Sequence, residues 1–178
     1  NGCTESATVE VDLNSDVPTA DAGDDQTLDC MISNLILDAT NSSSGGTITF
    51  EWTTNGGNFV SGQNTLMPEI DSPGEYILTV SDSANGCTAV STVVVDENLE
   101  QPMIDILPPE EINCDFPTIT IDGSNSTNSG NIQITWNTND GNIVGGGNTL
   151  TPEVDMGGTY QLTIFNQDNG CEETDSVN

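Results

Sequence analysis

The chain contains no lysine, no arginine and no histidine, against 29 aspartates and glutamates in 178 residues, so its formal net charge is −29. Because neutralising phosphates requires cationic side chains, this composition excludes nucleic acid as a partner. It also removes the Ser-His pair, the Schiff-base lysine and the cationic oxyanion clamp that many enzymes use. We therefore predict that the chain is not an enzyme, and that its acidic surface keeps it soluble.

Long apolar runs and helical periodicity are also missing. No apolar stretch approaches the roughly 18 residues that a membrane helix needs, which predicts no membrane insertion. No basic segment precedes an apolar core, so we expect that any export signal lies outside this sequence.

One stretch occurs twice: NTLMPEIDSPGEYILTVSDSANGC at 64–87 returns as NTLTPEVDMGGTYQLTIFNQDNGC at 148–171, an offset of 84 residues. Aligned without gaps, residues 17–94 and 101–178 are identical at 29 of 78 positions, which indicates a duplication. Each repeat must own a core. We expect a preceding repeat's last strand and a linker at 1–16, one repeat at 17–100, and a second at 101–178 that is truncated in its last strand.

Within each repeat, apolar residues alternate with polar ones over short segments that Gly, Asn and Pro separate. In the first repeat these segments lie near 35–37, 48–52, 59–60, 66–70, 76–80 and 93–95. Trp52 and Trp136 are predicted to be core residues. The pattern predicts an all-β fold, made of tandem antiparallel β-sandwich domains of the immunoglobulin-like or PKD-like kind.

Five cysteines lie at Cys3, Cys30, Cys87, Cys114 and Cys171, with 57 residues from 30 to 87 and again from 114 to 171. Because a repeat must fold as a unit, this spacing favours Cys30–Cys87 and Cys114–Cys171, with the partner of Cys3 upstream of residue 1. A strict sandwich puts Cys30 and Cys87 toward opposite ends, so Cys30–Cys171 between repeats stays open as the alternative. Either framework predicts an oxidising, extracellular setting.

The runs DAGDDQTLDC, LILDAT, ITFEWTTNGG and PGEYILTVSDSANGC, followed by STVVVD, resemble the tandem immunoglobulin-like/PKD-like repeats of giant secreted surface adhesins or fibres of the Bacteroidota. The resemblance covers nearly the whole chain. It implies stalks of adhesins or cell-surface filaments, in which neighbouring repeats of the same chain are the first partners and several chains assemble into a fibre.

Segments after the last strand of each repeat suggest a calcium site. They alternate acid, amide and acid at every second residue, which on an extended chain aims three oxygen donors to one side. Calcium takes six to eight such ligands. We predict that calcium stiffens the array through Asp12, Asn14 and Asp16 and through Asp96, Asn98 and Glu100, with Asp71, Asp122 and Asn125 completing the shells.

Short motifs also suggest glycan attachment. Asn41 and Asn125 begin acceptor sequons at equivalent loops, and Ser83 and Ser176 lie in Asp-Ser-Ala and Asp-Ser-Val, which resemble the O-glycosylation motif of the Bacteroidota. Such motifs arise by chance in this composition, and an intact mass measurement tests them.

The function that this sequence favours is a structural stalk or fibre segment of an extracellular adhesin, acidic, disulfide-stabilised and stiffened by calcium. The alternative is a module that binds a cell-surface glycan or protein through the loops at 41–46 and 125–130. A stalk should repeat these two loops in kind, whereas a binder should have one loop that diverges.

Overall fold

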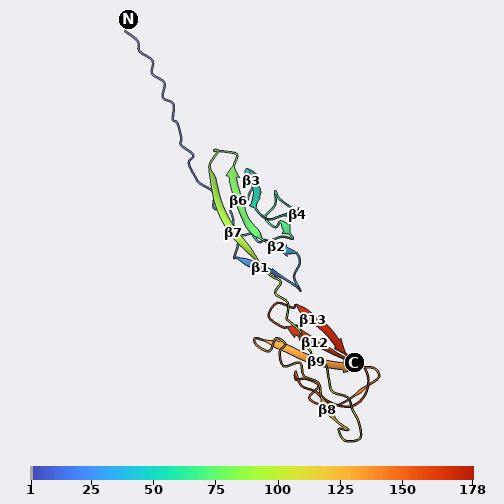
Figure 1. Ribbon diagram of the computed structural model, residues 1–178. Coiled ribbons are helices and arrows are strands. Elements are labelled where there is room, and N and C mark those ends of the chain that lie inside the picture. The colour runs from blue at the N-terminus through green and yellow to red at the C-terminus, as the bar shows by residue number, and fades with distance from the viewer. Residues whose placement is uncertain (1) are drawn as a thin grey trace. The chain divides into compact units, whose positions relative to one another are not determined.

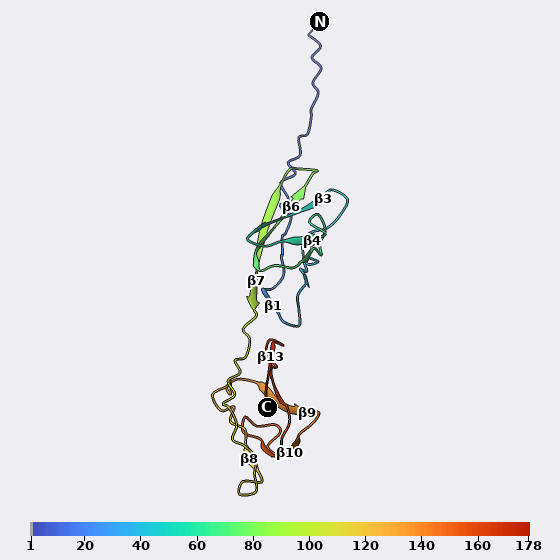
Figure 2. The same ribbon diagram turned by 45° about the vertical axis from the view of Figure 1, so that its right-hand side comes forward.

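The computed structural model describes residues 2–178, which form thirteen β-strands and no helix (Figures 1 and 2). No helix that could cross a membrane is therefore present among them. The strands are β1 (Gln26–Asp29), β2 (Leu35–Ile36), β3 (Ile48–Asn55), β4 (Phe59–Ser61), β5 (Glu69–Ile70), β6 (Gly74–Asp82), β7 (Thr88–Asn98), β8 (Ile119–Thr120), β9 (Ile132–Thr138), β10 (Asn142–Gly145), β11 (Glu153–Met156), β12 (Tyr160–Asn166) and β13 (Glu172–Val177).

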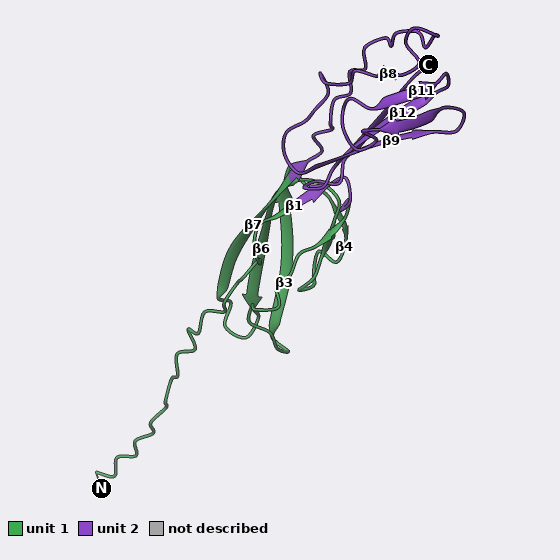
Figure 3. Ribbon diagram, turned by 90° about the horizontal axis from the view of Figure 1, so that it is seen from below, with its two compact units in different colours: residues 1–26, 34–96 green, residues 27–33, 97–178 purple. Residues whose placement is uncertain are grey.

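The chain divides into two compact units (Figure 3). Unit 1 holds the residues up to Gln26 and Asn34–Asp96, and unit 2 holds Thr27–Ser33 and Glu97–Asn178. The division falls close to the boundary between the sequence repeats, with one exception. Residues 27–33 belong to the first repeat by sequence and to unit 2 by their contacts.

Unit 1 contains a three-stranded sheet, ordered β2-β5-β4, and strands β7, β6 and β3 of a four-stranded sheet ordered β1-β7-β6-β3, whose β1 begins at Gln26 of unit 1 and continues into residues 27–29 of unit 2. The longest ladder pairs β6 with β3 and β7, with Trp52 opposite Leu78 and Tyr76 opposite Val93. Period-2 alternation sends one face of each strand inward. The resulting core is almost fully buried and includes Leu37, Trp52, Ile70, Tyr76, Leu78, Val80, Val93 and Val95.

Unit 2 repeats this design with sheets ordered β13-β12-β9 and β10-β11-β8. Its core consists of Ile121, Trp136, Val154, Tyr160, Leu162 and Ile164. The indole N–H of each tryptophan donates to a backbone carbonyl thirteen residues later, from Trp52 to Thr65 at 3.0 Å and from Trp136 to Thr149 at 2.9 Å. The predicted all-β fold and the predicted burial of both tryptophans are confirmed.

The strand predicted within residues 1–16 is not formed in the part that the structure describes, residues 2–16. Val9 and Val11 are 86% and 88% exposed, whereas their repeat equivalents Val93 and Val95 are buried at 0% and 1%. The difference in exposure follows from whether a neighbouring strand is present. Val93 and Val95 pair with Tyr76 and Gly74 on β6, while Val9 and Val11 belong to no strand within the described residues.

Strand β1 is the neighbour of β7 in its sheet, and the residues just before β1 show that the two segments run in the same direction. The N–H of Ala22 donates to the Ser91 hydroxyl at 3.1 Å, and the N–H of Val94 donates to the Asp25 carboxylate at 2.8 Å. The pairing therefore advances along both segments together, and the end of β1 lies near the end of β7. Cys30, which directly follows β1, therefore also lies near the end of β7.

Candidate functional site

The distinguishing site of this chain is the disulfide between Cys30 and Cys171, which we call the staple. Its two Cα atoms lie 5.0 Å apart, and 141 residues separate them in sequence. The predicted pairs Cys30–Cys87 and Cys114–Cys171 are wrong. Cys114 is exposed, Cys87 is partly buried, and neither is in a disulfide. The partner of Cys3 stays a prediction.

The strand order of the first sequence repeat explains why Cys30 does not pair with Cys87. Cys87 directly precedes the first residue of β7, whereas Cys30 follows β1, which lies beside the second half of β7. Eleven residues of β7 at about 3.3 Å each separate the two ends by roughly 36 Å. A disulfide needs Cα atoms within about 7 Å of each other. The intrarepeat pair is therefore excluded by the length of one strand.

Unit 2 repeats this separation. Ile112, just before Cys114, lines the same pocket as Asn178, which follows β13. Cys171 directly precedes β13 at its other end. Cys114 and Cys171 therefore lie toward opposite ends of the same sandwich.

The polypeptide around the staple fits closely on both sides. The N–H of Cys30 donates to the carbonyl of Asn169 at 3.0 Å. The Met31 side chain packs on Gly170, so that a Cβ at residue 170 would overlap it. Gly170 also has φ +68°, a conformation that side chains rarely adopt, so two constraints require glycine here. Cys171 itself is 1% exposed.

An asparagine orders the turn that carries Cys171, and we call this arrangement the asparagine clamp. The buried Asn169 side chain donates to the Asn98 amide oxygen at 3.0 Å and to the Glu100 carbonyl at 2.9 Å. Its own oxygen accepts from the N–H of Cys171 at 3.0 Å. The side chain thus fixes the segment after β7 to the Asn-Gly-Cys turn.

The clamp occurs a second time in unit 1. Asn85 donates to the Asn14 amide oxygen at 3.1 Å and to the Asp16 carbonyl at 2.9 Å, and it accepts from the N–H of Cys87 at 2.8 Å. Sequence reasoning read these asparagines only as turn residues. The signal that reveals them is the shared offset, since Asn14 and Asn98 precede Asn85 and Asn169 by 71 residues each.

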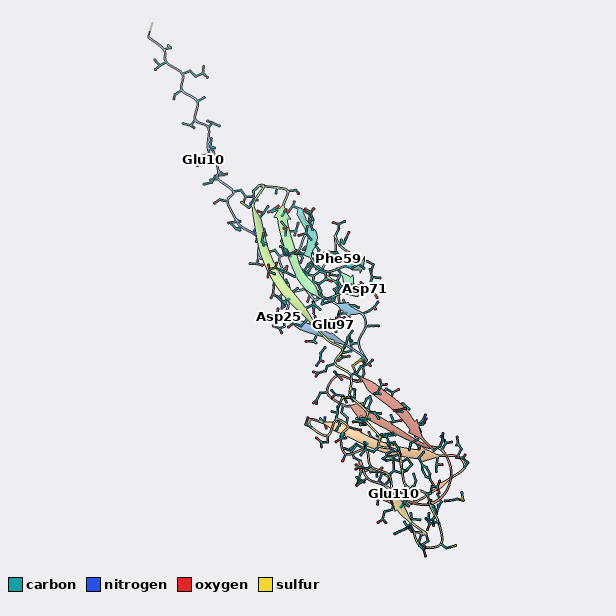
Figure 4. The ribbon with its side chains drawn as sticks, viewed as in Figure 1. Glu10, Asp25, Phe59, Asp71, Glu97 and Glu110 are labelled. Atoms are coloured by element: carbon teal, nitrogen blue, oxygen red, sulfur yellow. A yellow bond between two sulfur atoms is a disulfide. The ribbon has the colours of Figure 1, made fainter. Side chains whose placement is uncertain are left out.

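The clamp gives the acid-amide-acid segments a role other than calcium binding. Residues Asp12, Asn14 and Asp16, and likewise Asp96, Asn98 and Glu100, have exposed side chains. Within residues 2–178 there is no group of three or more His, Cys, Asp or Glu side chains placed to hold a metal ion. Figure 4 shows Asp71 on unit 1, well away from Glu10 on the extended N-terminal segment.

The carboxylates expected to complete the calcium shells serve their own loops. Asp71 accepts from the Asn58 amide at 2.7 Å. Asp122 accepts from the N–H of Ser124 at 2.9 Å, and hydrogen bonds from the side chain and backbone of Ser124 lower the pKa of its carboxyl. Asn125 is exposed. Calcium binding stays a prediction that melting with and without a chelator tests.

The loops considered for binding are built alike. In one, Ser42 is buried and its hydroxyl accepts from the N–H of Asp21 at 2.9 Å; in the other, Ser126 accepts from the N–H of Asp105 at 2.9 Å. The candidate glycan acceptors Asn41, Asn125, Ser83 and Ser176 are all exposed, and their modification stays a prediction. The two loops therefore repeat in kind.

One pocket in unit 2, of ≈ 400 Å³, has apolar walls that include Ile112, Ile121, Val154 and Tyr160, beside Gly158. In unit 1 the residue facing the equivalent glycine, Gly74, is the buried Val95. The pocket therefore lies where unit 1 has the core residue Val95.

Each unit also contains a tyrosine whose hydroxyl fixes a turn, as the tyrosine corner of immunoglobulin domains does. In unit 1 the Tyr76 hydroxyl donates to the Ser72 carbonyl at 2.6 Å and accepts from the N–H of Asn58 at 3.0 Å. Tyr160 makes the same bonds with Met156 and Asn142. Burial raises the pKa of the Tyr76 hydroxyl above 10.0, and the Asp71 carboxylate adds to this, although the hydrogen bond from Asn58 opposes both.

This raised pKa predicts that unit 1 loses stability in alkali. Above the unfolded pKa of about 10, unfolded Tyr76 releases its proton while folded Tyr76 keeps it, so unfolding is favoured as pH rises toward the folded pKa. Denaturation midpoints at neutral pH and above about pH 10 measure the effect. Tyr76→Phe should be less stable at neutral pH by about 1–2 kcal/mol, since Ser72 loses its donor, but less sensitive to alkali. Equal alkaline losses in both proteins would contradict the prediction.

No family model and no curated protein matches this sequence. Among solved structures, the N-terminal eight Ig domains of Down Syndrome Cell Adhesion Molecule match with a TM-score of 0.52 and 12% identity, over 91% of this chain and 27% of that one. The PKD domain from KIAA 1837 protein matches with a TM-score of 0.36 and 23% identity, over 49% and 94%. The human Desmocollin-1 ectodomain matches with a TM-score of 0.38 and 12% identity, over 94% and 37%. The match to the eight Ig domains, together with the observed sheets, shows that the chain has an immunoglobulin-like all-β fold.

Proposed function

We propose that this chain is a load-bearing spacer segment of an extracellular adhesin stalk or surface filament. Three features support the proposal: two similar sandwiches in tandem, a surface with no cationic side chain for chemistry, and a disulfide that joins the first sequence repeat to the second. Such a bond persists in oxidising surroundings, which supports a location outside the cytoplasm. Assembly of several chains into one fibre belongs to the same proposal.

The staple is the observation that carries this function. A force applied to the two ends of the chain enters at Cys30 and leaves at Cys171, because the covalent path runs through the two sulfur atoms. Residues 31–170 therefore do not bear the load along their backbone, and neither core can be drawn out as an extended chain. A spacer protected in this way keeps its length under tension.

Stretching single molecules by their ends tests the proposal. The stapled chain should yield only the segments outside residues 30–171. Reduction, or Cys30→Ser with Cys171→Ser, should release about 480 Å of additional contour length, at about 3.4 Å for each of the 141 residues. Cys87→Ser with Cys114→Ser is the matched control and should behave as the parent chain. Full extension of the oxidised parent would overturn the proposed role.

A further inference from the structure

The staple joins two local structures, which we call its halves. Each half occurs a second time in the chain without a disulfide. One half is a cysteine loop, residues 29–32 with Cys30 or residues 113–116 with Cys114. The other half is an Asn-Gly-Cys turn, residues 169–171 with Cys171 or residues 85–87 with Cys87. Residues 29–171 thus carry one complete staple, one unjoined loop and one unjoined turn.

The two cysteine loops have the same internal hydrogen bonds. In the joined loop the N–H of Asp29 donates to the Ile32 carbonyl at 3.0 Å, and the Asp29 carboxylate accepts from the N–H groups of residues 31 and 32 at 2.8 and 2.7 Å. In the unjoined loop the N–H of Asn113 donates to the Phe116 carbonyl at 3.0 Å, and the Asn113 amide oxygen accepts from residues 115 and 116 at 2.9 and 3.0 Å. The loop around Cys114 has therefore formed without a disulfide.

The two Asn-Gly-Cys turns match as closely. The N–H of Gly170 donates to the Asn166 carbonyl at 2.8 Å, and the N–H of Gly86 donates to the Asp82 carbonyl at 2.7 Å. The glycines have φ angles of +68° and +75°, and each turn has its own asparagine clamp. They differ in what covers them. Gly170 lies under Met31, whereas a Cβ at Gly86 would meet no atom within 4 Å.

We propose that the open turn at Cys87 of one copy receives the cysteine loop of another copy, forming a Cys114–Cys87 disulfide that links chains head to tail. The occupant is a second copy of this chain because the two open halves, on one molecule, are the same pair that the staple has already joined. Cys114 is exposed, and Cys87 lies in a turn whose glycine is uncovered. The two thiols lose two protons and two electrons to a small disulfide such as oxidised glutathione, which leaves as two thiols.

This inference depends on the halves of the staple, not on load bearing, so the stretching of single molecules can succeed while it fails. Incubation in a glutathione redox buffer tests it, at about 0.15 M salt, where a Debye length of about 8 Å screens the acidic surfaces. Cys3 is replaced by Ser in every protein, because residues 1–3 repeat the Asn-Gly-Cys sequence. The chain should give a ladder of disulfide-linked multimers on non-reducing gels.

Two single variants make the test directional. Cys114→Ser offers only the turn and Cys87→Ser only the loop, so each alone should stay monomeric, and their mixture should give dimers and nothing larger. Mass spectrometry after cleavage at acidic residues should find Cys114 joined to Cys87, with Cys30–Cys171 intact. Asn85→Ala keeps both thiols but removes the clamp, and should lose most of the multimers. Dimers from either variant alone, an internal Cys87–Cys114 bond, monomers capped with glutathione, or an unchanged ladder from Asn85→Ala would each overturn the proposal.

Discussion

Reducing the Cys30–Cys171 bond is expected to lower the free energy of unfolding of unit 2 by about 4–5 kcal/mol, the loop-closure value for a cross-link that spans more than 100 residues. Stabilities of single domains are only about 5–15 kcal/mol, so this is a large share. Because residues 27–33 belong to unit 2, unit 2 should respond most strongly. With a urea dependence of about 2 kcal/mol per M, the midpoint should fall by about 2 M.

Fluorescence separates the units, because the chain has only two tryptophans, Trp52 in unit 1 and Trp136 in unit 2. Trp52→Phe leaves Trp136 as the sole reporter of unit 2. Cys30→Ser with Cys171→Ser should reproduce the reduced midpoint without reductant, and Cys87→Ser with Cys114→Ser should not change it. The prediction is wrong if the free energies of unfolding of the oxidised and reduced proteins agree within about 0.3 kcal/mol.

Trp136→Ala should have an effect of similar size through a different cause. The side chain is 4% exposed and lies among Ile121, Leu162 and Ile164, so its removal costs the transfer and cavity terms of about 3–5 kcal/mol. The Thr149 carbonyl also loses its donor. The calorimetric transition of unit 2 should move down by about 15 °C or more, at roughly 4–8 °C per kcal/mol for a domain of this size.

Val144→Ala is the matched control for this substitution. Val144 belongs to the same unit but is 48% exposed, so its truncation should change the stability by no more than about 0.5 kcal/mol. In the Trp136→Ala protein, Trp52 is the remaining fluorophore and should report an unchanged transition of unit 1. A shift for Trp136→Ala no larger than that for Val144→Ala would show that the indole does not fill the core as described.

The fold was readable from the sequence because local pattern and burial agree. Alternation at Tyr76, Leu78 and Val80 predicts one inward face, and each of these residues is 0% exposed. The duplication also made the second core predictable, since Tyr160, Leu162 and Ile164 occupy the same positions. Alternation alone does not predict burial for a segment that has no neighbouring strand to pair with. Residues 7–11 have the same alternation as β7, and without a neighbouring strand they stay exposed.

The cysteine pairing was not readable, because it depends on direction along a strand. Equal spacings from Cys30 to Cys87 and from Cys114 to Cys171 suggest intrarepeat bonds, but spacing does not reveal that β1 follows β7 in parallel and ends at the far edge of the sandwich. The hydrogen bonds of the acid-amide-acid segments were not readable either. The regular spacing of their oxygens does not reveal that the Asn98 amide oxygen accepts a hydrogen bond from Asn169.

The separation of 141 residues between the bonded cysteines has a consequence for biosynthesis. At about 5–20 residues per second, a ribosome needs roughly 7–28 s to add the intervening segment after Cys30. Cys87 and Cys114 are both made in that interval, so Cys30 meets two incorrect thiols before its native partner exists. The cell must therefore delay oxidation or supply an isomerase that corrects early errors, and the yield of native protein should depend on that catalyst more than on the sequence of either core.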